Sequence, residues 1–183
     1  RALRDGLDVE LERLAASRRR ATPVEAVPGP AEEAGLEPSA AESTQGFVVF
    51  RRSPNESIYP SSRPQAGERL EALRCFATPG EREPVHLSLW PLRDLGDVRV
   101  GAADFVSAAG RIPAAAVDVR VVRQVFKREG RGTGSYRYRV SPYFLDRREA
   151  VPVTAGTTWS WWATVEVPEA TPAGTYEGAL EIT

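Results

Sequence analysis

The stretch Trp159–Val167, W-S-W-W-A-T-V-E-V, decides the fold class of this chain. Trp159, Trp161 and Ala163 share one parity with two valines, whereas the other parity holds polar residues and Trp162. A period of two is typical of a β-strand that buries one face. The stretch therefore predicts a strand with its apolar side turned to a core.

The residues that follow repeat this alternation after a turn. Prolines and a glycine between residues 168 and 174 interrupt the first pattern, and such residues favour a turn. Alternation resumes from Tyr176 to Ile182, with Leu180 on the apolar side. Two amphipathic strands joined in this way predict the closing hairpin of an antiparallel β-sandwich.

Short alternating segments separated by turn residues occupy the chain from Gly46 onward. The other predicted strands are Phe47–Arg51, Leu70–Ala77, Val85–Trp90, Val98–Ala102, Val117–Val122, Tyr136–Val140 and Tyr143–Leu145. Closely spaced short strands without helical periods between them are typical of a sandwich. We therefore expect an all-β protein, an immunoglobulin-like or jelly-roll-like antiparallel β-sandwich over residues 46–183.

Two different segments precede the predicted sandwich. Residues 1–20 are predicted as an amphipathic helix, because leucines recur there at helical spacing: Leu3, Leu7, Leu11 and Leu14. Residues 21–45 are rich in proline, alanine and glutamate and hold few large apolar side chains. Such a segment buries too little surface to offset its ordering entropy, so it is predicted to be a disordered linker.

Composition excludes several classes of protein. The net charge of −1 gives no field that would attract nucleic acid or an anionic membrane. No apolar run approaches the ~20 residues that span a bilayer. Lys127 is the only lysine among 24 basic residues, which together with abundant alanine indicates a GC-rich bacterial genome. The lone cysteine cannot form an internal disulfide, so the fold does not depend on an oxidising compartment. The sequence leaves export open.

The single histidine and the single thiol do not predict a nucleophilic site. By parity His86 faces outward, whereas Cys75 falls on the inward side with Leu73 and is predicted to be a buried structural cysteine. A cysteine nucleophile needs its base within hydrogen-bonding reach. One histidine and one cysteine also cannot complete a zinc tetrad without carboxylates. We therefore expect no metal site and no cofactor.

Paired carboxylates are the remaining candidates for acid–base chemistry. The pairs lie in turn-like sequences, Glu81 with Glu83 and Asp94 with Asp97. Glycoside hydrolysis needs one carboxyl group whose pKa is raised by burial, whereas carboxylates in turns stay solvated and ionised. We predict solvated turn charges, with a calcium-type oxygen site as the weaker alternative, and no catalytic residue.

Two tryptophans occupy the polar parity of their predicted strands, Trp90 and Trp162. Apolar side chains on a solvent face mark interfaces, and tryptophan also suits the stacking of sugars. Three alternatives remain: packing on another domain of the same polypeptide, coverage by a local loop, or a sugar platform that includes Tyr136 or Tyr138.

Three stretches of the sequence, in this order, are P-G-E-R-E-P-V-H-L-S-L-W-P-L-R-D-L-G-D-V-R-V (Pro79–Val100), Ile112–Val122 and Val165–Ile182. Together they resemble the sandwich domain that precedes the catalytic barrel in glycoside hydrolase family 123 and its bacterial relatives. The resemblance covers most of residues 47–183. It implies a non-catalytic accessory domain that packs against a C-terminal catalytic-type barrel of the same polypeptide, with a carbohydrate-binding module as the alternative.

The same resemblance places the chemistry outside this chain. Members of the family remove terminal N-acetylgalactosamine, assisted by the acetamido group of the substrate and by an adjacent Asp-Glu pair in the barrel. No Asp-Glu dipeptide occurs in this sequence. No catalytic residue is therefore carried over, and a parent protein that acts on N-acetylhexosaminides is what the resemblance implies.

Overall fold

The computed structural model describes residues 24–26, 32–129 and 136–183. The helix predicted over residues 1–20 lies outside them. Contacts divide the chain into two units, a larger one formed by residues 28–125 and 140–183 and a smaller one formed by residues 1–27 and 126–139. Each unit is described by itself.

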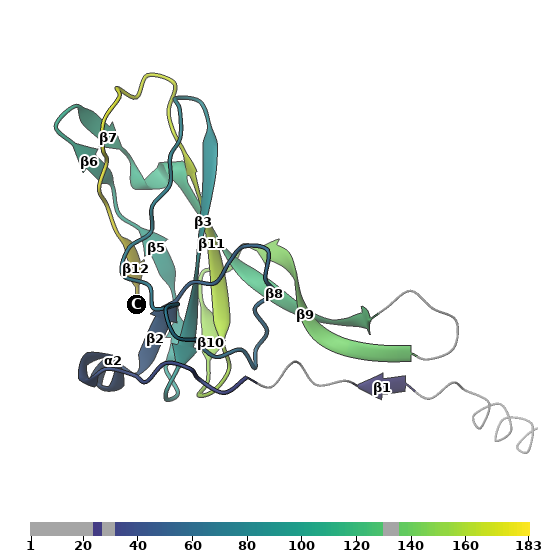
Figure 1. Ribbon diagram of the computed structural model, residues 1–183. Helices are drawn as coiled ribbons and strands as arrows, with labels where there is room; N and C mark the ends of the chain where they lie inside the picture. The colour runs from purple at the N-terminus through teal and green to yellow at the C-terminus, as the bar shows by residue number, and fades with distance from the viewer. Residues whose placement is uncertain (1–23, 27–31, 130–135) are drawn as a thin grey trace, which may run out of the picture. The chain divides into compact units, whose positions relative to one another are not determined.

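The regular elements of the larger unit are almost all strands (Figure 1). In chain order they are β2 (Phe47–Phe50), β3 (Arg82–Pro91), β4 (Gly96–Val98), β5 (Val100–Ala102), β6 (Phe105–Ser107), β7 (Gly110–Ile112), β8 (Val117–Glu129), β9 (Tyr136–Asp146), β10 (Val151–Val153), β11 (Trp159–Glu166) and β12 (Leu180–Ile182). The described helical elements are α2 (Ala40–Gln45) and a 3-10 turn at Ala114–Ala116. The predicted all-β class is thus confirmed. In the described part of the chain, no helix has the length and apolar character to cross a bilayer.

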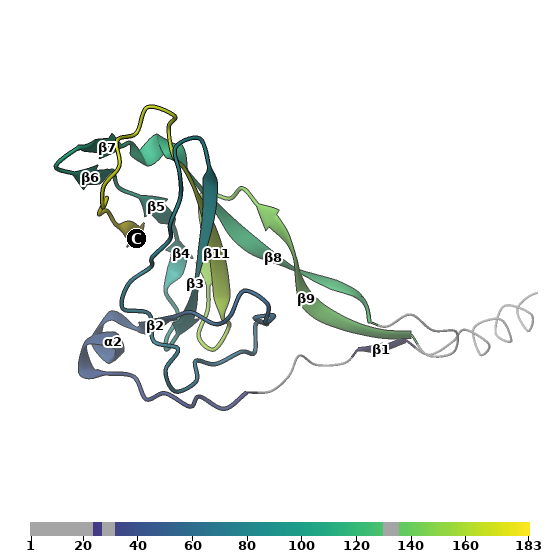
Figure 2. The ribbon, with the colours of Figure 1, turned by 45° about the horizontal axis from the view of Figure 1, so that its top comes forward.

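One large sheet carries the order β9-β8-β11-β3-β2 within the larger unit. β11 lies at its centre and pairs antiparallel with β3 on one side and with β8 on the other. Three antiparallel strand pairs accompany this sheet, namely β10–β4, β12–β5 and β6–β7. Figures 1 and 2 both show the β12–β5 pair beside β3 and β11.

The core fills the space between the large sheet and the pairs β10–β4 and β12–β5. Trp161 and Leu87, which lie opposite one another in β11 and β3, are 4% and 3% exposed. They cluster with Val98 of β4 and Val151 of β10, and β12 adds partly buried apolar side chains. Full burial of a side chain of this size contributes about 1.5–3 kcal/mol. The inward parity predicted for β11 and β3 is therefore confirmed.

The prediction of a closing hairpin is wrong. β12 pairs with β5, with Ile182 opposite Val100, and makes no ladder with β11. The reason is that both edges of β11 are already occupied by β3 and β8. The last strand therefore crosses to the other side of the core.

The prediction of a strand at Leu70–Ala77 is also wrong. This segment has no regular structure; its only ladder contact is at the preceding residue, where Arg69 forms an isolated bridge with Phe50. Leu73 still packs against the core. The segment is therefore anchored by the side chain of Leu73 and, at its first residue, by a bond from the N–H of Leu70 to the carbonyl of Val49 at 3.0 Å.

The described end of the predicted linker departs from disorder. Ser39 and Glu42 form a capping box that starts α2, with Ser39 N donating to Glu42 Oε2 at 2.7 Å and Glu42 N donating to Ser39 Oγ at 3.2 Å. Gly46 ends the helix with a positive φ of 93°, which glycine adopts without steric cost. The S-x-x-E pattern of a capping box is present in the sequence, within a segment whose proline-rich composition predicted disorder.

The smaller unit contains β1 (Val24–Ala26) and the adjoining ends of β8 and β9. β1 runs parallel to β9, with Val24 opposite Tyr136 and Ala26 opposite Tyr138. The ring of Tyr138 stacks on that of Phe126, with centroids 5.2 Å apart.

Candidate functional site

Trp90 and Trp162 lie on the face of the large sheet that is turned away from the core, and both are half-buried. Trp162 sits opposite His86 of β3 and Arg120 of β8. Its ring stacks on the imidazole of His86, with centroids 5.4 Å apart and an interplanar angle of 20°. The guanidinium of Arg63 lies 5.9 Å from the centroid of Trp90, within cation–π range. Each tryptophan thus has one ring face occupied.

A long loop, residues 51–67 (the outer-face loop), covers this side of the sheet (Figure 1). Ile58, in the loop, is 8% exposed. The side chain of Gln124 donates to the carbonyl of Ile58 at 3.0 Å, and the N–H of Thr158 donates to the carbonyl of Pro60 at 2.9 Å. Local coverage by a loop, one of the three alternatives, therefore accounts for part of the burial of the outer face.

His86 lies on the outer face of β3, as its parity predicted, but the outer-face loop covers it. His86 is only 9% exposed, and its Nε2 is 2.8 Å from the carbonyl oxygen of Arg52. A carbonyl only accepts, so Nε2 carries the hydrogen. The imidazole therefore fastens the outer-face loop to β3.

A buried arginine within the outer-face loop also holds the loop in place. The side chain of Arg52 is 8% exposed and meets two carboxylates, each through a pair of hydrogen bonds. It donates to Glu68 at 2.7 and 3.0 Å and to Glu32 at 3.1 and 2.9 Å. It also donates to the carbonyl of Arg63 at 3.0 Å. Paired guanidinium–carboxylate bonds of this kind are among the strongest polar contacts in proteins.

Two carboxyl groups, Glu32 and Glu42, have a lowered pKa and are held in their ionised form. Burial raises the pKa of Glu32, but hydrogen bonds from Arg52, from the N–H of Arg63 and from Ser62 together leave it below its ordinary value. The hydrogen bonds from Arg69 lower the pKa of Glu42 to about 2. Neither carboxyl group can serve as a proton donor at neutral pH, because a general acid needs a raised pKa.

The carboxylate pairs singled out in the sequence are only partly in turns, because Glu83 lies in β3 and Asp97 lies in β4, whereas Glu81 and Asp94 lie in loops. An oxygen of Glu81 accepts from the N–H of Thr78 at 2.7 Å, and an oxygen of Asp94 accepts from the N–H of Ala155 at 2.8 Å. Both carboxylates are exposed. Within the described residues, no three histidine, cysteine or acidic side chains gather as metal ligands would. The arrangement supports turn geometry and offers no acid–base pair.

The prediction that Cys75 is buried is wrong. Cys75 is exposed, because Leu70–Ala77 does not form the strand whose parity would have turned it inward. Partial shielding from solvent and the nearby carboxylate of Glu83 raise the pKa of the thiol. A thiol with a raised pKa is a poor nucleophile at neutral pH.

The tyrosines predicted to complete an aromatic platform belong to the smaller unit. Tyr138 is half-buried and stacks on Phe126, and Tyr136 lies opposite Val24 in the pairing of β9 with β1. Trp90 and Trp162 belong to the larger unit. The shared platform therefore stays a prediction.

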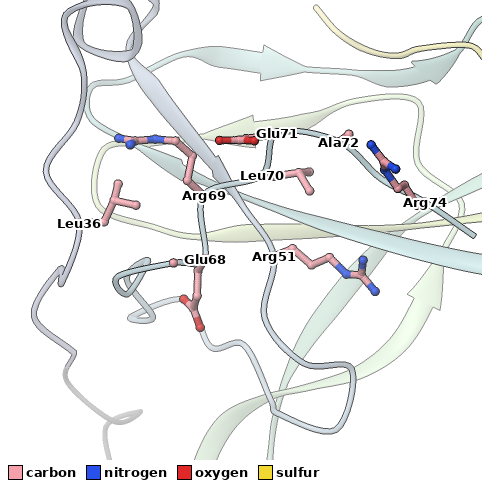
Figure 3. Close-up of a pocket in the computed structure, with 9 residues that line it drawn as sticks. Leu36, Arg51, Glu68, Arg69, Leu70, Glu71, Ala72 and Arg74 are labelled. Atoms are coloured by element: carbon pink, nitrogen blue, oxygen red, sulfur yellow. The ribbon is translucent and has the colours of Figure 1, made fainter.

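Sequence reasoning missed an arginine-lined groove of about 600 Å³ beside β2. Leu36, Leu70 and Ala72 line it together with charged side chains from both of its ends. Figure 3 shows Arg69 and Glu71 toward one end and Arg51 and Arg74 toward the other. Arg69 is bound to Glu42 at 2.9 Å. The groove is an open polar surface, and its charges are largely balanced.

Comparison with known proteins gives the family. Residues 55–183 match the model of the glycoside hydrolase 123 N-terminal domain. The chain belongs to this family. No match was found among curated proteins.

A solved structure shares the fold of this family member. It is a family 123 glycoside hydrolase from Clostridium perfringens, whose structure was analysed to detail the hydrolysis of glycolipid glycans. The TM-score is 0.54 at 18% identity, and the match covers 58% of this chain and 19% of that enzyme. The matched region is therefore a minor part of a much longer polypeptide.

Proposed function

We propose that this chain is a non-catalytic accessory domain that packs against a glycoside-hydrolase-like catalytic barrel of the same polypeptide. The observation that carries the proposal is the match of residues 55–183 to an N-terminal domain of a glycoside hydrolase family. The length of the Clostridium perfringens enzyme, of which the match covers 19%, leaves ample chain for such a barrel.

The chemistry of the described side chains supports a non-catalytic role. The single histidine donates a hydrogen bond to a backbone carbonyl. The carboxyl groups of Glu32, Glu42 and Asp104 have a lowered pKa and are bound to arginines. The exposed thiol has a raised pKa. A nucleophile and its base must lie within about 3.2 Å of each other, and no such pair is formed by these groups.

The substrate of the parent is proposed to be an N-acetylhexosaminide, as the resemblance to family 123 implies. The test compares the full polypeptide with residues 32–183 on a 4-nitrophenyl N-acetylgalactosaminide. Turnover by the full polypeptide and none by residues 32–183 is the expected result. Turnover by residues 32–183 alone would refute the non-catalytic role.

Packing on the barrel is tested separately by tryptophan fluorescence. Trp90 and Trp162 keep accessible surface on the outer face, so contact with another domain would shift their emission. Emission from residues 32–183 is compared with that of the full polypeptide after Trp90→Phe and Trp162→Phe replacements assign the signals. Unchanged emission from both tryptophans would remove them as interface residues.

The alternative function is a carbohydrate-binding module. Trp90 and Trp162 are partly accessible and would stack on sugar rings, but Arg63 and His86 each occupy one face of these tryptophans. One free face per ring still permits stacking. Affinity electrophoresis with a panel of polysaccharides decides the matter, and unchanged mobility with every polysaccharide would discard this alternative.

A further inference from the structure

The irregular segment before β3 holds the most exposed large apolar side chain of the described residues. Phe76 is 85% exposed, and Arg74 and Cys75 beside it are exposed as well. The two residues that flank these three, Leu73 and Ala77, pack against buried apolar clusters. The segment is thus held to the core at both ends, while its middle presents an aromatic ring to solvent. A single exposed apolar side chain is common on proteins, so Phe76 has to be considered with its neighbours.

The charges that line the groove beside β2 largely balance in total, but they are unevenly distributed along it. Arg51 and Arg74 lie toward one end (Figure 3). Within the described part of the chain, neither guanidinium has a hydrogen bond or an ion pair. At the other end Arg69 is bound to Glu42, and these bonds, together with the charge of Glu71, raise the pKa of Arg69. One end of the groove is therefore compensated, and the other carries two unpaired positive charges.

The remaining carboxylate of the groove does not compensate these charges. Glu68 lines the groove, but both of its oxygens accept hydrogen bonds from Arg52. Arg51 and Arg74 repel each other, and a carboxylate placed between them relieves that repulsion while it accepts paired bonds from a guanidinium. Arginine and aromatic side chains are enriched at protein interfaces. The combination suits a protein partner that presents acidic side chains beside an apolar contact.

We infer that Arg51, Arg74 and Phe76 form a contact surface for the catalytic-type domain of the same polypeptide, which presents carboxylate side chains to the two arginines. This inference rests on the proposed function. The partner follows from the match to an N-terminal domain and from the solved family 123 enzyme, of which the match covers only 19%. Its acidic character follows from charge complementarity, which fixes the register of an interface and disfavours wrong partners.

The first test places an amine at each arginine of the full polypeptide. Lys127 is the only lysine of this sequence, so Arg51→Lys and Arg74→Lys each add a nearly unique amine and keep the positive charge. A carbodiimide joins an amine directly to a carboxylate that touches it. We expect an amide between the introduced amine and an acidic residue of the catalytic-type domain, identified by mass spectrometry of peptides. Arg123→Lys, at another exposed arginine without a partner among the described residues, should give no such product.

The second test uses the exposed thiol of Cys75, which lies between Arg74 and Phe76 in the sequence. Contact at this surface shields the thiol from N-ethylmaleimide. In the full polypeptide, Arg51→Glu and Phe76→Ser should therefore speed the labelling of Cys75 at least about tenfold relative to the wild type. An added negative charge disfavours the thiolate and slows labelling, so a faster rate in Arg51→Glu reports lost contact. Arg123→Glu is the matched control and should leave the rate unchanged.

Four outcomes would overturn the inference. If the introduced amines form no amide with the catalytic-type domain while a dihydrazide, which joins carboxylates at longer range, still links the two domains, the contact lies elsewhere and the proposed function stands. An absence of links of either kind between the domains refutes both. Amides that form only between two molecules and disappear on dilution assign the surface to a second copy of the chain. Equal labelling of Cys75 in the wild type and in the Arg51→Glu and Phe76→Ser variants also refutes the inference.

Discussion

Arg52 and Glu68 face each other through two hydrogen bonds, from Nε to Oε1 at 2.7 Å and from Nη2 to Oε2 at 3.0 Å. The arginine side chain is 8% exposed and that of the glutamate 17%. Because the pair is buried, removal of one partner leaves a charge without compensation. The pair joins the two ends of the outer-face loop, which covers His86, because Arg52 lies near its start and Glu68 follows its last residue.

The first prediction concerns that pair. Arg52→Met is expected to lower the free energy of unfolding by about 3–5 kcal/mol, because Glu68 and Glu32 lose their shared partner. Urea unfolding followed by tryptophan fluorescence measures the loss. The control is Arg82→Met, whose partner Glu166 is 57% exposed, and a change of less than about 1 kcal/mol is expected there. Equal losses in the two variants would contradict the role assigned to Arg52.

The second prediction concerns pH. Glu42 has a pKa lowered from 4.5 to about 2 by its bonds with Arg69, and the pKa of Glu32 is also lowered. A carboxyl group with a lowered folded-state pKa stabilises the protein above its unfolded-state pKa and loses that contribution as pH falls toward the folded-state value. The urea concentration at the unfolding midpoint should therefore decrease as the pH is lowered from about 4.5 to about 2. Glu42→Gln should flatten that decline, and an unchanged slope would argue against this contribution.

The third prediction concerns a buried pair of hydroxyls. Ser88 is fully buried and Ser160 is 5% exposed, and their oxygens lie 2.7 Å apart across β3 and β11. Ser160→Ala should cost about 1–3 kcal/mol, because it leaves the hydroxyl of Ser88 without its partner. The double variant with Ser88→Ala should cost less than the sum of the single changes. Strict additivity of the three unfolding energies would show that the hydroxyls do not interact.

The fourth prediction concerns the boundary of the folding unit. The family match begins at residue 55, but Val48 and Phe50 of β2 are completely buried and Glu32 is bound to Arg52. A protein that starts at residue 55 should therefore fail to unfold cooperatively, whereas one that starts at residue 32 should do so. Thermal unfolding followed by circular dichroism compares them. A cooperative transition in the shorter protein would show that β2 is dispensable.

Period-two alternation was sufficient to find the main strands of the core. The inward side of Trp159–Val167 and of Val85–Trp90 is buried as the parity predicted. Parity depends only on the local backbone, because successive side chains of a strand point to opposite faces. It cannot predict which strands become neighbours, and for this reason the partner of β12 was wrong.

Long-range coverage explains the remaining differences. His86 occupies the outer parity of β3, yet a loop from more than 20 residues earlier in the sequence buries it. Nothing in the spacing of Arg52 distinguishes a buried arginine from an exposed one, since its partner Glu32 comes from a segment whose composition resembles a linker. Such contacts depend on how separated parts of the chain meet in space.

The attachment of Glu32 to Arg52 also has a mechanical consequence. Tension that reaches the domain from its N-terminal side meets this ionic clamp before it meets α2 and the ladder between β2 and β3. The contact between Glu32 and Arg52 therefore carries an applied force first, and the hydrophobic core is not loaded until this contact breaks. Single-molecule stretching between residues 32 and 183 should show the rupture of the Glu32–Arg52 contact before the separation of β2 from β3.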